Sequence, residues 1–281
     1  MSVANIDLSG IGVGSSSDNY CESLGCENTV LGDGRCDDCK KVTPIPIATS
    51  YTEIDWSKTK GGRIPRSIHE RQQWMGATVN DDNQKRPFAP WGENDHPEAD
   101  DDTDARWKWS LEANYVTGGK LESELEQSSS IEHRAFIQQV DDPIAHVDFD
   151  DVIDPDSGDV HPTVVSILNQ IGRTFTEISQ SETGIHAIYY GELPDNVPQA
   201  GWDLDDKPFG TNEDVPSVEI YDRRRALVVT GNHVRGTPAG IHEWGSDGLR
   251  ELLKENDQLI ETDVSKPSDD YEDFDVRSCV D

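Results

Sequence analysis

The stretch His146-Val-Asp-Phe-Asp-Asp151 carries the pattern that decides the fold around it. Side chains of a β-strand alternate between its two faces, so we expect Val147 and Phe149 to enter a core. Asp148 and Asp150 then share the opposite face, where two carboxylates one strand pitch apart suit a hard divalent cation. The competing interpretation is an ordinary strand end. Asp-x-Asp pairs arise by chance in an acidic chain, and a turn-like Asp-Pro-Asp-Ser-Gly segment follows.

Two later segments match this one in chemistry and in order. Ser181-Glu-Thr-Gly-Ile-His186 leads a histidine into an apolar run, and Val218-Glu-Ile-Tyr-Asp222 places Glu219 between two apolar residues. Glu219 alternates away from the core, whereas Asp222 falls on the core face, so Glu219 is predicted to be the third acid. Acids and a histidine on three short strands indicate a metal-dependent phosphoryl-transfer site. A buried structural histidine is the alternative for His186.

The chain has 281 residues, with 56 acidic and 24 basic side chains and a formal net charge of −32. This length can bury a sizeable core in one large domain with small appendages. One interpretation is a disordered or DNA-mimicking acidic protein, because low hydrophobicity with high net charge disfavours compaction. The other is a folded protein from a high-salt cytoplasm, where salt screens the repulsion between carboxylates. Acids interspersed with aromatic and β-branched runs favour the second.

The charge also limits how the protein can bind its partners. Phosphate contacts weaken steeply with salt, so nucleic-acid binding would depend on local Arg and Lys, stacking and metal bridges. No apolar run approaches the roughly 20 residues of a spanning helix, and the N-terminus lacks the features of a signal peptide. We therefore predict a cytoplasmic protein with no membrane role.

Four cysteines near the N-terminus form two pairs, Cys21-x4-Cys26 and Cys36-x2-Cys39. Four thiolates in residues 21–40 of a cytoplasmic chain would satisfy tetrahedral zinc and hold together a segment too short for its own core. Disulfides or unused thiols are the alternatives, since the first pair is spaced more widely than CxxC. Residues 1–20 are predicted to be flexible, and the acidic tail 259–281 is predicted to be disordered.

The remaining chain, residues 62–258, is predicted to form one domain after a linker at 44–62. Hairpin-spaced strands and a few helices favour an α+β fold with a largely antiparallel sheet. The tryptophans at 74, 91, 107 and 109 are predicted to lie in the core rather than to stack on bases. Helices are predicted at 67–73, 120–127, 162–172 and 248–255, and an extended segment at 85–90. Strands are predicted at 136–140, 145–149, 174–178, 185–190, 217–221 and 226–229, the first two as neighbours joined by a turn.

Three of these segments, together with Thr230-Gly231, resemble the archaeo-eukaryotic primase superfamily. They are Asp148-Phe-Asp150, Thr176-Glu-Ile-Ser-Gln-Ser-Glu-Thr-Gly-Ile-His186 and Val218-Glu-Ile-Tyr-Asp222. Within that superfamily they look most like the primase-polymerases of phages and plasmids, including the deep-sea phage polymerase type. The similarity runs from about residue 64 to residue 253, and it implies a catalytic core with an RRM-like palm. Glu182-Thr183 departs from the commoner Ser-Gly, so we expect a stiffer loop.

The resemblance implies nucleotidyl transfer, in which a 3′-hydroxyl attacks the α-phosphate of a (d)NTP on a single-stranded DNA template. Asp148, Asp150 and Glu219 would hold two Mg²⁺ or Mn²⁺ ions. His186 would donate to the triphosphate with help from Ser181. Arg224 or Arg225, in the basic run Arg223-Arg-Arg225, would contact triphosphate or template, with a solvated turn as the alternative. No helicase domain follows residue 258, so we expect either that an unwinding partner is a separate chain or that this is a standalone or shortened member.

The leading hypothesis is therefore a DNA primase-polymerase of a haloarchaeal virus, plasmid or integrated element. Another palm-type nucleotidyltransferase, such as a cyclase, would also pair acids on adjacent strands. A different class is a catalytically idle replication initiator or an acidic interaction or DNA-mimic protein. The intact acids and His186 argue against an idle site, because such a site has no physical need for them.

Overall fold

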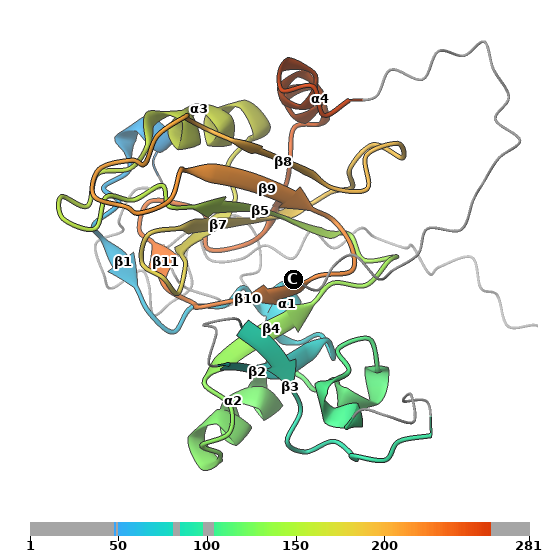
Figure 1. Cartoon of the computed structure of the whole chain (residues 1–281). Coiled ribbons are helices and arrows are strands. Elements are labelled where there is room, and N and C mark those ends of the chain that lie inside the picture. Colours follow the sequence, from blue (N-terminus) through green and yellow to red (C-terminus); the bar gives the residue numbers. More distant parts are fainter. Residues whose placement is uncertain (1–47, 49, 81–84, 98–103, 260–281) are drawn as a thin grey trace, which may run out of the picture.

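The computed structural model describes residue 48 and residues 50–80, 85–97 and 104–259, which form two β-sheets (Figure 1). The predicted flexible N-terminus 1–20, the predicted zinc segment with Cys21, Cys26, Cys36 and Cys39, and the acidic tail from residue 260 lie outside the described residues. No helix of the described part is long and apolar enough to cross a membrane.

The larger sheet carries the predicted motifs. Its strands lie in the order β1-β11-β6-β7-β5-β9-β8, with antiparallel neighbours throughout, and β12 pairs with β7 in parallel. The mixture of helices and antiparallel sheets agrees with the expected α+β class. The bounds are β1 Thr59–Lys60, β5 Ile144–Asp150, β6 Phe175–Ile178, β7 Ile185–Tyr190, β8 Ala200–Asp203, β9 Ser217–Tyr221, β11 His233–Val234 and β12 His242–Glu243.

Two helices cover one face of this sheet, α3 (Pro162–Ile171) and α4 (Ser246–Glu255) (Figure 1). Apolar residues recur in α3 with helical spacing, and Pro162 at the first position is preorganised for a helix start. The buried face of α3 and the leucines of α4 pack on one core with the inward residues of β5, β7 and β9. That core is an apolar layer between helices and sheet.

The predicted linker at 44–62 contributes to the fold from Tyr51 onward, which corrects that prediction. Tyr51 is 2% exposed, belongs to the same core and hydrogen-bonds the Thr176 hydroxyl at 2.9 Å. Strand β1 extends the large sheet beside β11. The packed unit therefore begins well before residue 62. The buried Tyr51 ring anchors the short 3₁₀ helix η2 (Tyr51–Glu53), in which it is the first residue.

The smaller sheet has the order β10-β4-β2-β3 and lies below the large sheet in Figure 1. Trp74, Phe136 and Leu121 form a second core together with Phe175 and Ile188, which come from the uncovered face of the large sheet. This shared core joins the two sheets. The bounds are β2 Trp74–Val79, β3 Lys85–Phe88, β4 His133–Ile137 and β10 Ala226–Val228, with helices α1 Arg66–His69, α2 Gly118–Gln127, η3 Ala105–Trp107 and η4 Glu112–Asn114.

Several local predictions were wrong in this smaller sheet. The strand predicted at 136–140 is β4 at His133–Ile137, and it does not pair with β5 but lies in the other sheet. Helix α1 is a single turn, and Trp74–Val79, left without a prediction, forms a central strand. The turn after β4 therefore connects two sheets rather than two arms of a hairpin.

The tryptophan prediction holds in part. Trp74 is fully buried, and Trp91 and Trp107 are half-buried against the second core, whereas Trp109 is 37% exposed. The extended segment predicted at 85–90 contains β3, an edge strand in which Pro87 is tolerated because one side of the strand pairs with no other strand of the described part.

Candidate active site at the junction of the two sheets

A row of polar side chains crosses the large sheet. In the strand register Glu177 of β6 lies opposite His186 of β7, His186 opposite Asp148 of β5, and Asp148 opposite Glu219 of β9. Directly opposed residues have Cβ atoms about 4.5–5.5 Å apart and point to the same face. Four strands thus bring one histidine and three acids into a single line on the face that the helices leave uncovered.

The alternation predicted from the sequence is confirmed around this row. Val147 and Phe149 are fully buried on the helix side, whereas the Asp148 side chain is 24% exposed on the other face. Glu219 is exposed. Asp222 is buried, where its carboxylate accepts the Leu193 N–H and the Arg223 guanidinium. Asp222 therefore anchors the connection between the two sheets and does not join the row.

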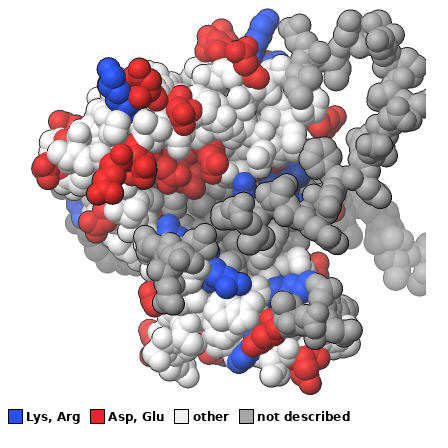
Figure 2. All heavy atoms as spheres, in the orientation of Figure 1, with Lys and Arg blue, Asp and Glu red and all other residues white. Residues whose placement is uncertain are grey.

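A pocket of about 200 Å³ opens where the row meets the smaller sheet. Asp148, His186 and Glu219 line it from the large sheet, and Lys85 lines it from β3. Arg225, just before β10, also lines it, with its guanidinium carbon 4.0 Å from the centre of the Tyr221 ring. Figure 2 shows many acids on the lobe that carries α3 and α4, while several Lys and Arg side chains lie near the waist between the lobes.

Asp150 lies one pleat beyond the row, opposite Ser217. Desolvation, and next the negative charge of Asp148, raise the pKa of Asp150 to about 6, with a smaller contribution from Glu219. The nearby His186 acts in the opposite direction. Burial and the neighbouring carboxylates therefore make ionisation of Asp150 less favourable than that of a solvated aspartate.

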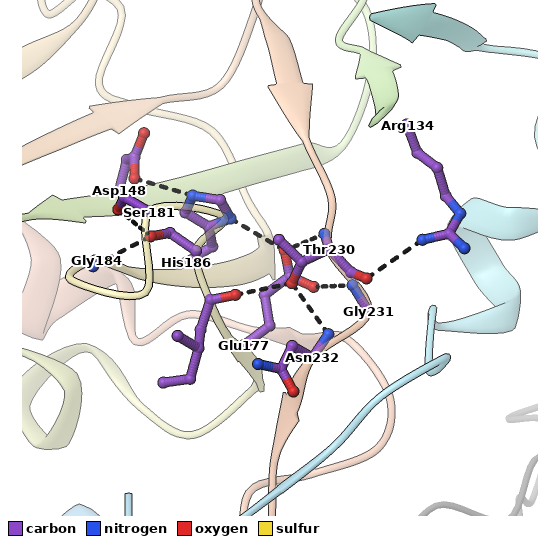
Figure 3. Close-up of polar contacts among 11 residues, drawn as sticks. Arg134, Asp148, Glu177, Ser181, Gly184, His186, Thr230, Gly231 and Asn232 are labelled. Carbon is purple, nitrogen blue, oxygen red and sulfur yellow. Dashed lines mark hydrogen bonds and ion pairs between the residues drawn. The ribbon is translucent and has the colours of Figure 1, made fainter. Parts of the chain in front are cut away.

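His186 bridges two carboxylates (Figure 3). Its Nδ1 lies 3.0 Å from Glu177 Oε1, and its Nε2 lies 3.3 Å from Asp148 Oδ1. Burial by itself lowers the pKa of His186, but Asp148 and then Glu177 outweigh this and raise the pKa above its ordinary value. Both ring nitrogens therefore face carboxylates, which stabilise the protonated ring relative to the neutral one.

Glu177 is a residue whose role the sequence reasoning missed. Its side chain is fully buried, and besides His186 it accepts the Thr230 N–H at 2.9 Å and the Gly231 N–H at 2.8 Å. Gly231 has φ +70°, and a Cβ there would lie 3.1 Å from the Arg63 backbone nitrogen. Continuing the hairpin register back from His186 through the β6–β7 turn would have placed Glu177 opposite that histidine.

Tyr221 and His146 were also missed. The Tyr221 hydroxyl donates to the Glu219 carboxylate, and burial together with this bond raises the pKa of Tyr221. The His146 ring lies 5.1 Å from the Tyr221 ring, and its buried Nδ1 has no hydrogen-bond partner among the described residues. Burial lowers the pKa of His146 to about 3, so this ring is neutral. The strand period could have found both residues. Tyr221 lies two residues after Glu219, and His146 lies two residues before Asp148, so each shares the strand face of that acid.

The donor set fits a divalent cation in its chemistry but not yet in its arrangement. Asp148 Oδ1 is buried and contacts His186 without making a hydrogen bond, and it suits a hard cation. Within the described residues, however, no three His, Cys, Asp or Glu side chains already converge on one point. The Glu219 carboxylate also accepts a hydrogen bond from the Tyr221 hydroxyl.

The remaining predicted residues lie at the edge of the site. Ser181 is exposed in the β6–β7 turn, where its hydroxyl contacts those of Ser179 and Thr183. Glu182 in the same turn has φ +66°, a left-handed conformation that costs a residue with a Cβ. Arg224 is exposed with φ +52° and does not line the pocket, whereas Arg225 does.

No protein-family model matches the chain. A search of curated proteins finds similarity to the DNA Primase-polymerase of Nitratiruptor phage NrS-1, with 28% identity over 96 residues. The matched segment covers 34% of this chain and 12% of the phage protein. This similarity supports a distant relationship to a primase-polymerase, and it supports no finer assignment.

Proposed function

We propose that this chain is a catalytic unit of a primase-polymerase, which joins nucleotides from (d)NTPs into a strand on a single-stranded DNA template. One observation carries the proposal: Asp148, His186 and Glu219 lie side by side on three neighbouring strands and face a pocket closed by a second sheet. The name of the phage relative supports the same class of reaction.

The strand order supports an RRM-like palm as the catalytic core. Following the chain, β5, α3, β6, β7 and β9 assemble as the antiparallel order β6-β7-β5-β9. The first and last of these strands are adjacent near the middle of the sheet, one face is covered by helices, and the other carries the acids. That is the arrangement expected of a palm whose open face holds template and nucleotide.

Asp148, Asp150 and Glu219 are the residues that would hold Mg²⁺ or Mn²⁺. Such ions, when bound, activate the attacking hydroxyl and stabilise the leaving oxygen. The 3′-oxygen forms a bond to the α-phosphorus, and the bond from that phosphorus to the bridging oxygen of the β-phosphate breaks. His186 would give the triphosphate a charged N–H donor, which Glu177 holds in place from behind.

The template would enter along the junction of the sheets. Lys85 and Arg225 offer positive charge at the pocket, in contrast to the acids on the lobe above (Figure 2). Local contacts of this kind suit a protein with a net charge of −32, which we propose comes from a haloarchaeal element and works in a saline cytoplasm. Unwinding by a helicase would supply single-stranded template, and zinc held by the four N-terminal cysteines would aid template binding.

The direct test is extension of a labelled primer on a DNA template by the purified protein in molar KCl, with Mg²⁺ or Mn²⁺. We expect template-dependent incorporation that EDTA abolishes. A folded wild-type protein that incorporates no nucleotide with either ion would contradict the proposal. Metal analysis of the same preparation tests the zinc proposal, because one zinc per chain is expected and the Cys36→Ser variant should lose it.

One observation favours a second candidate, a catalytically idle replication initiator or acidic interaction protein. The described residues contain no three-ligand arrangement that is already assembled for a metal. The idle candidate predicts that Mg²⁺ and Mn²⁺ change neither stability nor activity. The enzyme candidate predicts that either ion raises the melting temperature of the wild-type protein, and that Asp148→Ala loses most of this increase.

A further inference from the structure

The outer edge of the smaller sheet carries a cluster of cations and aromatic rings that has no role in the site described above. Strand β3 forms this edge, and among the described strands it pairs only with β2 (Figure 1). Side chains of a strand alternate between its two faces. Lys85 and Pro87 line the pocket beside Asp148, so Arg86 and Phe88 share the other face. One short strand therefore connects the pocket with a second surface.

Arg86 and Phe88 both contact the Trp107 ring, which comes from η3. The Arg86 guanidinium carbon lies 5.3 Å from the centre of the Trp107 ring, and the ring centres of Phe88 and Trp107 are 4.3 Å apart. A second guanidinium, that of Arg106, lies over Phe88 but is paired with Asp104. Arg86 is exposed and makes no ion pair with any described residue, so its charge and its flat guanidinium are open to a ligand.

Trp109 adds an exposed ring next to this stack in the chain. It is 37% exposed, which makes it an exception to the prediction that the tryptophans lie in the core. It follows Trp107 by two residues, and the Tyr115 hydroxyl donates to its carbonyl at 2.7 Å, which holds the backbone in place. A single exposed ring is ordinary on a protein surface. An exposed ring that follows an Arg–Trp stack forms a surface for flat ligands.

Single-stranded DNA is the ligand whose chemistry matches this surface. Unpaired bases stack on tryptophan rings and on the guanidinium plane of arginine, while Arg and Lys contact the phosphates. A duplex keeps its bases stacked inside and cannot use the rings. Phosphate contacts weaken steeply in the molar salt that a chain with net charge −32 is expected to need, whereas stacking acts at short range and is not screened.

We infer that Arg86 and Trp109 form a stacking surface for the single-stranded template on its way to the pocket, with Trp107 supporting Arg86 from behind. The inference rests on the proposed function and deepens it. Lys85 lies beside Arg86 in β3 and lines the pocket, so a strand held on this surface is within one residue of the pocket wall. The bases stack on Arg86 and Trp109, and the phosphates pass Lys85.

The acids around this surface favour DNA over an acidic protein partner. Glu93 and Asp95 follow β3, and the sequence has further acids at 81–82 and 98–102. They repel any polyanion at low salt, but salt at 1 M limits this repulsion to about 3 Å. An acidic protein would then lose its ion pairs as well as the repulsion and would have no bases to stack. Single-stranded DNA keeps its stacking energy under the same conditions.

The test is equilibrium binding of fluorescently labelled oligo(dT) to the full chain in 1 M KCl without added divalent ions, measured by anisotropy. Trp109→Ala should raise the Kd about fivefold or more, as for the loss of one stacked base. Trp109→Phe keeps an aromatic ring and should stay within about twofold of wild type. The effect of Trp109→Ala should be the same in 3 M KCl, because stacking is not screened by salt.

A second pair of variants tests the guanidinium. Arg86→Lys keeps the positive charge but loses the flat stacking surface, so the Kd of oligo(dT) should rise about threefold or more. Arg250→Lys, the same change at an exposed position of α4, is the matched control and should leave the Kd unchanged. If Trp109→Ala does not fold, this pair decides, and equal affinities of the two variants would overturn the inference.

Three other outcomes would also overturn it. Equal Kd values for Trp109→Ala and wild type would leave this surface to a protein partner. A loss in Trp109→Phe as large as in Trp109→Ala would exclude stacking as the source of affinity. Wild-type binding of a blunt duplex as tight as that of oligo(dT) would exclude recognition of unpaired bases. None of these results bears on the proposed function, which instead fails if wild type binds oligo(dT) as expected but incorporates no nucleotide.

Discussion

Neighbouring residues of β5 belong to two different regions of the molecule. Val147 and Phe149 pack under α3 and α4, whereas Asp148 lies in the polar row beside His186 and Glu219. The core side needs only apolar surface of roughly the right volume. The polar side needs the correct register between four strands, because a slip of one residue would turn every side chain to the other face.

The comparison teaches that the two faces depend on different information. The apolar face is specified by alternation within each strand, and each strand contributes separately. On the polar face, His186 acquires its environment only because Glu177 and Asp148 arrive from two other strands. Substitutions on the two faces should therefore affect different measurements.

The largest expected effect is on catalysis. Asp148→Ala should lower nucleotide incorporation by roughly 10³-fold or more, because it removes a carboxylate that would stabilise the transition state through bound metal. Its stability should be retained, since Asp148 is partly exposed and its removal relieves repulsion with Asp150. Primer extension and thermal unfolding measure the two properties. A folded variant that keeps more than roughly a tenth of the activity would show that the site is wrongly assigned.

The adjacent core residue should show the reverse pattern. Phe149→Ala should lower the free energy of unfolding by about 3–5 kcal/mol, because it leaves a cavity under the helices. Urea unfolding in molar KCl measures this, with Asp150→Ala as the control from the other face of β5. If the two variants lose equal stability, the two faces do not differ in the way that the structure indicates.

Glu177→Gln tests the polar face without removing its volume. It should lower the free energy of unfolding by about 1.5–3 kcal/mol, since a buried carboxylate that accepts three hydrogen bonds becomes a neutral amide. The pKa of His186 should fall, because the negative charge beside its Nδ1 is lost. NMR titration of the imidazole follows this change. An unaltered His186 pKa in a folded variant would contradict the bridging role.

The smallest effect concerns pH. Because the pKa of Asp150 is raised to about 6 in the folded protein, the folded state holds this proton more tightly than the unfolded state. The contribution of Asp150 to stability is therefore fully present below pH ~4, the unfolded pKa. It is lost as the pH rises through about 6. Unfolding of wild type and Asp150→Asn in EDTA across this range should differ by such a step, and parallel curves would disprove the raised pKa.

Much of the large sheet could be predicted from the sequence. The alternation around Asp148 and Glu219, the buried position of Asp222 and helix α3 follow from local periods of two and 3.6 residues. Those periods are properties of short segments, so they survive in any arrangement that buries one face. The period of two residues was enough to assign Glu219, and not Asp222, to the face that the helices leave uncovered.

The tertiary structure alone decided which segments meet. Strands β4 and β5 follow each other in the chain yet lie in different sheets, and Arg134 reaches the Thr230 turn from a strand far away in the sequence. Glu177 looks in the sequence like an unfavourable acid in an apolar strand, and only pairing with β7 and contact with the Thr230 turn satisfy it. Alternation fixes the face on which a side chain lies, whereas its neighbours depend on strand pairing and on packing between sheets, which bring together residues far apart in the chain.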